Sequence, residues 1–155
     1  MFSIPALSTG DDFLQIEGIT LVAQNTKEKS AEKKRILVVD DDVGILRVFK
    51  SILEREGYVV ETAETGMAAL EKINSEKFDV CLVDVRLPDM EGTDILLSMV
   101  NDSKTIKIVV TGFSTGEIGK RAADFGADDF LVKPVKPEEL IATVRDCLII
   151  REQES

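Results

Sequence analysis

The sequence predicts an α/β fold in which a doubly wound, parallel, five-stranded sheet is covered by helices on both faces. Two observations support this prediction. Five short apolar runs are bounded by polar or turn-forming residues. Longer segments with apolar residues at helical spacing lie between them, from Arg35 almost to the end of the 155-residue chain. Alternation of strands and helices favours parallel strands with right-handed crossovers, because each helix returns the chain to the same end of the sheet.

The elements follow one another regularly. A short apolar run is interpreted as a strand, and a segment with helical apolar spacing as a helix. The predicted strands are residues 35–39, 58–62, 79–83, 106–110 and 129–132, and the predicted helices are residues 43–56, 66–75, 93–101, 115–125 and 137–151.

Several helix ends carry their own signals. Asp42 precedes the first helix and is a suitable N-cap. Gly57 and Gly126 follow the first and fourth helices, where a left-handed C-cap residue is expected. Pro137 opens the last helix and is followed by two acids, which suit the positive end of a helix.

The chain is predicted to contain an N-terminal extension, residues 1–34, and one domain, residues 35–152. The stretch from residue 26 to residue 34 is charged without an apolar period, as in a solvated linker. Residues 13–22 are more apolar. They fit one or two short strands, a remnant of a neighbouring module or a segment of artificial origin, and the sequence does not decide among these.

Composition excludes several classes of function. The net charge of −10 argues against a nucleic-acid-binding surface. There is no histidine and no Cys-x-x-Cys pair, so a zinc site is not expected, and the two cysteines are interpreted as reduced structural thiols. No apolar stretch approaches the roughly 20 residues that span a membrane, and no signal peptide is evident. We therefore expect a cytoplasmic protein without a membrane partner.

Polar side chains follow four of the predicted strands. Asp84 follows the third strand, Asp40 and Asp41 follow the first, Thr111 follows the fourth, and Lys133 follows the fifth. Because the carboxyl ends of parallel strands converge on one crevice, we expect these five residues to meet there. Carboxylates so close together repel one another unless a cation joins them, and oxygen ligands suit Mg²⁺. The sequence therefore predicts a magnesium site.

Each of these residues also has a structural interpretation when taken alone. An aspartate after a strand usually caps a helix or forms a turn, a threonine there is usually structural, and a lysine is usually solvated. Asp42 fits the capping role, so we exclude it from the site. Five such residues on one predicted sheet edge are much harder to explain in this way.

Five short motifs connect this pattern to a known family. Their order and spacing resemble those of response-regulator receiver domains, the phosphoryl-accepting modules of two-component signalling, which include the chemotaxis receivers. The resemblance covers residues 34 to 152 and implies a flavodoxin-like (βα)5 three-layer sandwich with strand order 2-1-3-4-5. The motifs are Val38-Val39-Asp40-Asp41, Leu82-Val83-Asp84, Leu87-Pro88-Asp89-Met90-Glu91-Gly92, Val110-Thr111-Gly112 and Lys133-Pro134.

The resemblance implies a role for each acidic residue. Asp84 would accept the phosphoryl group as a mixed anhydride, a reaction open to carboxylates. Mg²⁺ would be held by Asp84, by Asp41 directly, by Asp40 partly through water, and by the backbone carbonyl of Arg86. Such a metal suits phosphoryl transfer, which depends on positioning and charge neutralisation.

The remaining implied roles concern contact with the phosphoryl group and the response to it. Lys133 would pair with Asp84 before transfer and with a phosphoryl oxygen afterwards, and Thr111 would donate its hydroxyl to another. Phe130 occupies the position of the family's aromatic switch residue, although simple core packing is an alternative. Arg86 and Phe113 are bulky residues at the two positions that tune access of water.

The functional hypothesis is therefore a phosphorylation-gated switch rather than an enzyme acting on other substrates. A cognate histidine kinase or phosphotransfer protein would supply the phosphoryl group. A downstream effector would bind the face formed by residues 111–150, and homodimerisation is an alternative use of that face. Direct DNA binding is not expected. A stand-alone shuttle, a phosphorelay intermediate and a part of a larger protein all remain open.

Two alternatives belong to other classes. A phosphatase of the haloacid-dehalogenase type also uses a strand-end aspartate with Mg²⁺, threonine and lysine, but it needs an acid two residues after the nucleophile. That position holds Arg86. A flavin- or nucleotide-binding domain needs a phosphate-cradling loop after the first strand, where the acids at 40–42 would repel a phosphate.

Overall fold

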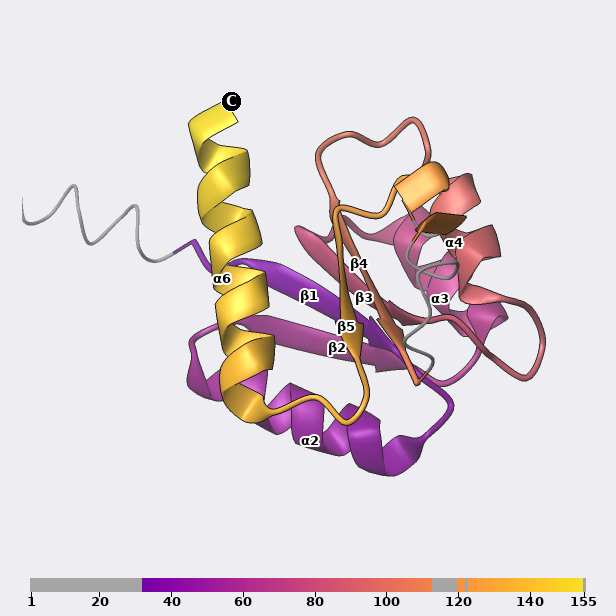
Figure 1. Ribbon diagram of the computed structural model, residues 1–155, viewed down its shortest axis with the longest axis horizontal. Coiled ribbons are helices and arrows are strands. Elements are labelled where there is room, and N and C mark those ends of the chain that lie inside the picture. The colour runs from indigo at the N-terminus through magenta and orange to yellow at the C-terminus, as the bar shows by residue number, and fades with distance from the viewer. Residues whose placement is uncertain (1–31, 113–119, 122, 155) are drawn as a thin grey trace, which may run out of the picture. The chain divides into compact units, whose positions relative to one another are not determined.

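In the computed structural model, the described residues are 32–112, 120–121 and 123–154 (Figure 1). Four predictions fall wholly or mostly outside them: the N-terminal extension with its charged linker, the short strands at 13–22, the position of Phe113, and most of the helix at 115–125. Within that helix, residues 120, 121, 123 and 124 are described and helical.

A single five-stranded parallel sheet forms the centre of the domain, in the order β2-β1-β3-β4-β5. The predicted fold class is confirmed, and each strand lies within one residue of its predicted bounds at either end. The order reverses between β1 and β3, and the crevice beside such a reversal is where open α/β sheets bind ligands. The strands are β1 (Arg35–Val39), β2 (Val59–Ala63), β3 (Val80–Asp84), β4 (Ile106–Thr111) and β5 (Asp129–Val132).

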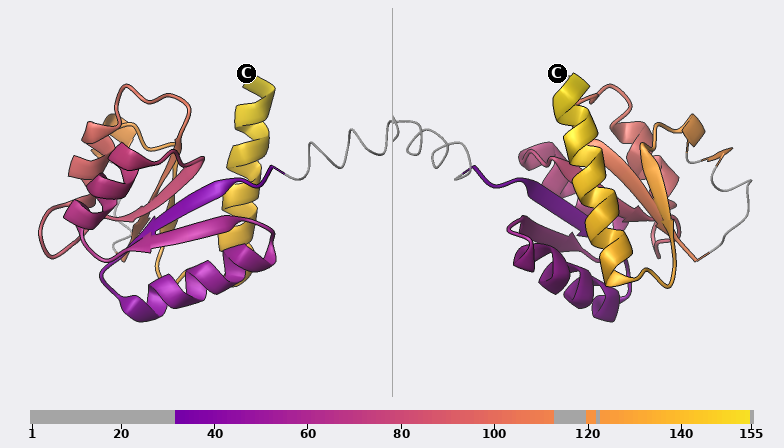
Figure 2. Two further views of the ribbon diagram at one scale, coloured as in Figure 1. Left: turned by 180° about the vertical axis from the view of Figure 1, so that it is seen from behind. Right: turned by 60° about the vertical axis from the view of Figure 1, so that its left-hand side comes forward.

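Helices cover both faces of this sheet. Figures 1 and 2 show α2 and α6 on one face and α3 and α4 on the other. The helix α4 ends three residues earlier than predicted, and α6 continues three residues further. The described helices with full bounds are α2 (Val43–Arg55), α3 (Gly66–Ser75), α4 (Gly92–Ser98) and α6 (Pro137–Glu154). None of the described helices is long and apolar enough to cross a lipid bilayer.

Alternate residues of the central strands face opposite layers. In β3, Leu82 packs with the residues under α2 and α6, whereas Cys81 and Val83 pack with those under α3 and α4. All five residues of β3 are buried. Burial raises the pKa of the Cys81 thiol to about 12, so this cysteine is an inert structural thiol, as predicted.

The helix ends match the sequence signals. The Asp42 carboxylate accepts hydrogen bonds from Gly44 N (2.9 Å) and Ile45 N (3.3 Å), which confirms it as the N-cap of α2. Gly57 and Gly126 have φ angles of 97° and 93°, the left-handed region where glycine is favoured. The Asp42 carboxylate caps α2, so Asp40 and Asp41 are the acids after β1 that remain available to a functional site.

Candidate functional site

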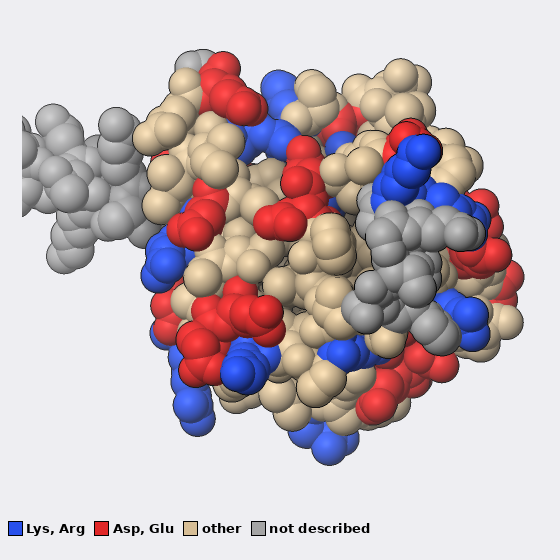
Figure 3. Space-filling view, in the orientation of Figure 1, with Lys and Arg blue, Asp and Glu red and all other residues tan. Residues whose placement is uncertain are grey.

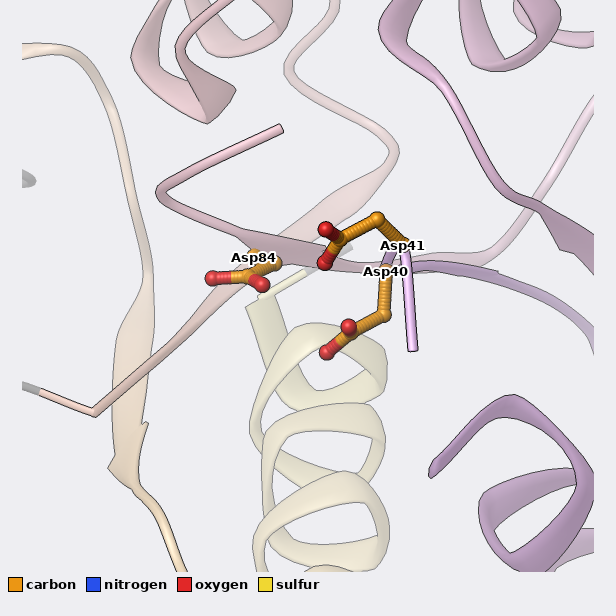
Figure 4. A group of neighbouring side chains, drawn as sticks. All are labelled: Asp40, Asp41 and Asp84. Atoms are coloured by element: carbon orange, nitrogen blue, oxygen red, sulfur yellow. The ribbon is translucent and has the colours of Figure 1, made fainter. Parts of the chain in front are cut away.

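Three carboxylates meet at the carboxyl ends of the two central strands. Asp40 and Asp41 follow β1, and Asp84 is the last residue of β3. The neighbouring strands place Val39 opposite Val83 in register, so the acids that follow them converge. One carboxylate oxygen from each residue lies within 4.8 Å of the others (Figure 4). We call these three residues the acidic cluster.

The members of the cluster differ in burial and in bonding. Asp40 is only 2% exposed and Asp84 7%, whereas Asp41 is exposed. The Oδ1 atom of Asp40 accepts the backbone N–H of Asp42 at 2.8 Å, and Oδ1 of Asp84 accepts that of Arg86 at 3.2 Å. The two buried acids are therefore fixed by the backbone, and Asp41 opens toward solvent.

Lys133 joins the two buried acids. Its Nζ lies 2.7 Å from Oδ2 of Asp40 and 3.2 Å from Oδ2 of Asp84. The sequence predicted Asp84 as its partner, and the structure adds a shorter contact with Asp40. The backbone N–H of Lys133 donates to the carbonyl of Thr111 at 2.7 Å, which ties the loop after β5 to the end of β4. The Lys133–Pro134 peptide bond is cis.

Thr111 and Phe130 occupy the strands next to the cluster. Thr111 is the last residue of β4 and is 1% exposed. Phe130 lies on β5 and is 47% exposed, so it is not among the buried core residues. A Cβ atom at Gly112 would meet no described atom within 4 Å, so within this part of the chain no close approach requires glycine there.

The net effect of the surroundings is to raise the pKa of both Asp84 and Lys133. Burial, together with the nearby charge of Asp40, raises the pKa of Asp84 above its ordinary value, although the Arg86 N–H and Lys133 oppose this. Burial tends to lower the pKa of Lys133, but its hydrogen bond to Asp40 and the charge of Asp84 outweigh burial and raise it. Lys133 therefore stays charged at neutral pH and partly neutralises two acids that repel each other.

Comparison with known proteins identifies the family. Residues 36–145 match the family model described as the response regulator receiver domain. This chain belongs to that family. Solved structures agree: the receiver domain protein from Methanospirillum hungatei has 42% sequence identity and a TM-score of 0.77, covering 80% of this chain and 100% of that one. The response regulator TrrA from Thermotoga maritima, solved with Mg²⁺ and BeF, has 32% identity and a TM-score of 0.66 over 73% of this chain and 97% of that one.

Curated relatives are longer than the region they share with this receiver domain. The alginate biosynthesis transcriptional regulatory protein AlgB of Pseudomonas aeruginosa is 38% identical over 127 residues, which are 81% of this chain and 28% of AlgB. The alkaline phosphatase synthesis transcriptional regulatory protein PhoP of Bacillus subtilis is 36% identical over 116 residues, which are 74% of this chain and 48% of PhoP. The chain thus spans between about a quarter and a half of these two relatives.

The acidic cluster of this receiver domain fits Mg²⁺. It offers carboxylate oxygens only, which a hard cation prefers, and it contains no thiolate or imidazole that would select a softer metal. Asp41 is exposed, so a cation can reach the cluster from solvent, and the buried Asp40 and Asp84 supply further negative charge. The predicted contribution of the Arg86 carbonyl remains a prediction.

Sequence reasoning missed the role of Gly92. A Cβ atom at this position would lie 2.0 Å from the backbone oxygen of Asp84 and 2.9 Å from its carbonyl carbon. Only glycine lets the chain pass this close to the Asp84 backbone. The Gly92 N–H also donates to the carbonyl of Val85 at 2.6 Å. The available signal was the glycine that ends the Leu87–Gly92 motif, which also carries part of the family resemblance.

Proposed function

We propose that this receiver domain accepts a phosphoryl group from a histidine kinase or a phosphotransfer protein onto Asp84 in a Mg²⁺-dependent reaction. One observation carries this proposal: Asp84 ends the central strand β3 within 4.8 Å of the other two acids of the cluster and beside Lys133. A carboxylate so placed has charge-neutralising groups around it, which is what phosphoryl transfer requires.

In the transfer step, one Asp84 oxygen forms a bond to phosphorus while the bond from phosphorus to the donor histidine nitrogen breaks. The nitrogen keeps the electron pair of the broken bond, and Asp84 becomes a mixed anhydride. Bound Mg²⁺ supplies charge neutralisation for the phosphoryl oxygens. Asp40 and Asp41 would hold it, with Asp84 and the Arg86 carbonyl.

Lys133 has a second task in this proposal. Its Nζ is 3.2 Å from Oδ2 of Asp84 and already charged, so little movement takes it to a phosphoryl oxygen on that residue. Asp40 holds the other side of the ammonium group at 2.7 Å and keeps it oriented. Thr111, at the end of the adjacent strand β4, would donate its hydroxyl to another phosphoryl oxygen.

The output is a conformational switch of the face formed by residues 111–150. Thr111 and Lys133 are joined through the backbone at 2.7 Å, so motion at the end of β4 reaches the segment after β5. Phe130, on β5, is half-exposed, and in this proposal its side chain changes position in the switch. A phosphoryl oxygen that bonds only one arrangement of Thr111 would shift the population toward that arrangement.

This face also has the apolar surface that a partner needs. Ile149 and Ile150 near the end of α6 are 46% and 54% exposed, in addition to Phe130. Figure 3 shows uncharged surface between the charged side chains on the side of the domain that carries α6 and β5. An effector protein or a second copy of the chain is the proposed partner. The named relatives are transcriptional regulators, and any such activity of a longer protein is a separate proposal.

The first test is phosphorylation by acetyl phosphate, followed by intact-protein mass spectrometry. We expect one added phosphoryl group on the wild-type protein with Mg²⁺, none with EDTA, and none on Asp84→Asn in either condition. Asp79→Asn is the control, because Asp79 immediately precedes β3, at the end of the strand opposite to Asp84. This variant should be labelled like the wild-type protein. Full labelling of Asp84→Asn would overturn the proposal, and labelling in EDTA would overturn its dependence on metal.

A further inference from the structure

The loop that follows the acceptor strand is tied to a neighbouring helix. We call this loop, residues 85–91, the acceptor loop. Near its tip, Oδ1 of Asp89 accepts the Gly66 N–H at 2.8 Å, and Oδ2 accepts the Met67 N–H at 2.9 Å. These two N–H groups open α3 and have no acceptor within the helix. The helix is therefore capped from another part of the chain.

The helix also has a cap of its own. The Thr65 side chain accepts the N–H of Ala68 at 3.0 Å, and the Thr65 carbonyl accepts that of Ala69 at 3.1 Å. Thr65 stabilises α3 without contacting the acceptor loop in this way. Asp89 does both, since it fills the remaining donors of the first turn and holds the loop. The two residues can thus be separated by mutation.

Short-range bonds carry the position of the loop tip to its base. Leu87 N donates to the carbonyl of Met90 at 3.2 Å, and Arg86 pairs with Glu91 as an antiparallel bridge. At the base, the Arg86 N–H donates to Oδ1 of Asp84 at 3.2 Å. The loop is therefore a closed turn. We expect displacement of its tip to move Arg86, whose backbone N–H donates a hydrogen bond to the Asp84 carboxylate.

We propose that Asp89 is a positioning residue that anchors the acceptor loop to α3 and thereby sets Arg86 relative to the acidic cluster. The proposal rests on the function proposed above for its connection to Mg²⁺. Bonds from a carboxylate to backbone N–H groups are charge-assisted and about twice as strong as neutral ones. Loss of a group that orients a metal ligand typically costs about 10–100-fold in metal affinity or activity.

The decisive comparison is between Asp89→Ala and Thr65→Ala. Both remove a cap of α3, but only the first releases the loop. Glu64→Gln is a second control, since Glu64 is an exposed acid next to the same helix end and its loss changes the charge there by the same amount. Asp89→Asn keeps one acceptor oxygen in place of two and should give an intermediate result.

Two readouts are measured well below each variant's melting temperature. Calorimetric titration with Mg²⁺ should show an affinity about tenfold weaker for Asp89→Ala, and unchanged within about twofold for the two controls. In metal-free protein, amide hydrogen exchange at Arg86 and Gly92 should be faster in Asp89→Ala only. Equal effects of Asp89→Ala and Thr65→Ala would reduce Asp89 to a helix cap and overturn the proposal.

The exchange readout separates this proposal from the proposed function. It needs neither metal nor phosphoryl donor, so it reports on the loop even if Asp84 is never phosphorylated. Faster exchange at Arg86 with wild-type Mg²⁺ affinity would contradict the link to the metal site. Unchanged exchange in Asp89→Ala would show that the anchor does not hold the loop.

Discussion

Three charges share a small, largely buried space at the end of the sheet. Asp40 and Asp84 approach the same lysine, and the pKa of Asp84 is raised by burial and by Asp40. Lys133 offsets part of the repulsion, and the exposed Asp41 adds further negative charge. A divalent cation bound by the folded state alone would stabilise that state by mass action. We therefore expect the residues proposed to bind Mg²⁺ to destabilise the metal-free domain.

Replacement of Asp84 by asparagine should stabilise the metal-free protein. A carboxyl whose folded pKa is raised costs no stability below its unfolded pKa, and the cost grows as pH rises through the folded pKa. We expect the melting temperature of Asp84→Asn in EDTA to exceed that of wild type at neutral pH, and the difference to shrink at acidic pH. Thermal melts at several pH values check this. A difference that grows on acidification would contradict the direction of the pKa shift.

The adjacent acids Asp41 and Asp42 should differ sharply. Loss of a direct carboxylate ligand removes more attraction than loss of an orienting group, so Asp41→Ala should weaken Mg²⁺ binding by at least about tenfold. Asp42→Ala should cost only about 1 kcal/mol of stability, because Asp42 caps α2. Calorimetric Mg²⁺ titration of both variants gives the ranking. A larger loss of affinity in Asp42→Ala would mean that the metal ligands are misassigned.

Among the secondary-structure elements, the bounds of strands were easier to predict than the ends of helices. The apolar runs placed every strand to within one residue because burial of β3 and its neighbours leaves a local signal. The helix α4 ended early, at Ser98, and is followed by a turn in which Asp102 accepts the backbone N–H groups of Lys104 and Thr105. The strand-end positions also predicted the acidic cluster.

Contacts between distant loops were not predictable in the same way. The Asp89 bonds to α3 and the Lys133 contact with Asp40 join segments 22 or more residues apart. They leave no periodicity in the sequence. The close approach of Gly92 to the Asp84 backbone likewise depends on how the acceptor loop folds back. Sequence patterns predicted which residues would be near the site, and tertiary structure decided how they are held.

Gly92→Ala should be strongly destabilising, and Gly66→Ala is its matched control. Each glycine opens a helix. A Cβ atom at Gly92 would meet the Asp84 backbone at 2.0 Å, whereas at Gly66 it would meet the side chain of Met90, which can move. We expect Gly92→Ala to lose about 2 kcal/mol or more in urea denaturation and Gly66→Ala clearly less. Equal losses would show that the Asp84 backbone yields as readily as a methionine side chain.

At the scale of the whole molecule, the site and the proposed output face lie on connected strands. The acidic cluster lies at β1 and β3, Thr111 ends β4, and Phe130 lies on β5. The parallel pairing β3-β4-β5 gives an unbroken path of strands from the acceptor to this face. A change at Asp84 therefore has a physical route to residues 111–150. The route in the other direction, through β1 to β2, lacks Thr111 and the Lys133 segment bonded to it, and for this reason we expect the response on the 111–150 side.

Binding of beryllofluoride with Mg²⁺, which imitates a phosphoryl group, should change amide chemical shifts mainly along this route. We expect large changes at 111 and 130–135, in addition to those of the cluster itself, and small ones in the second strand and the body of α2. The same titration of Thr111→Ala should lose the changes around Phe130 while keeping those at Asp84. Changes confined to residues 36–60 would contradict a switch on the 111–150 face.

The central claim is that the carboxylate of Asp84 receives the phosphoryl group, and chemical trapping tests it most directly. Borohydride reduces an acyl phosphate to an alcohol, so a phosphorylated aspartate becomes homoserine and can be located by peptide mass spectrometry. After treatment with acetyl phosphate and Mg²⁺, we predict homoserine at position 84 and at no other aspartate, and none in the EDTA control. Homoserine at Asp40 or Asp41, with Asp84 unchanged, would contradict the account.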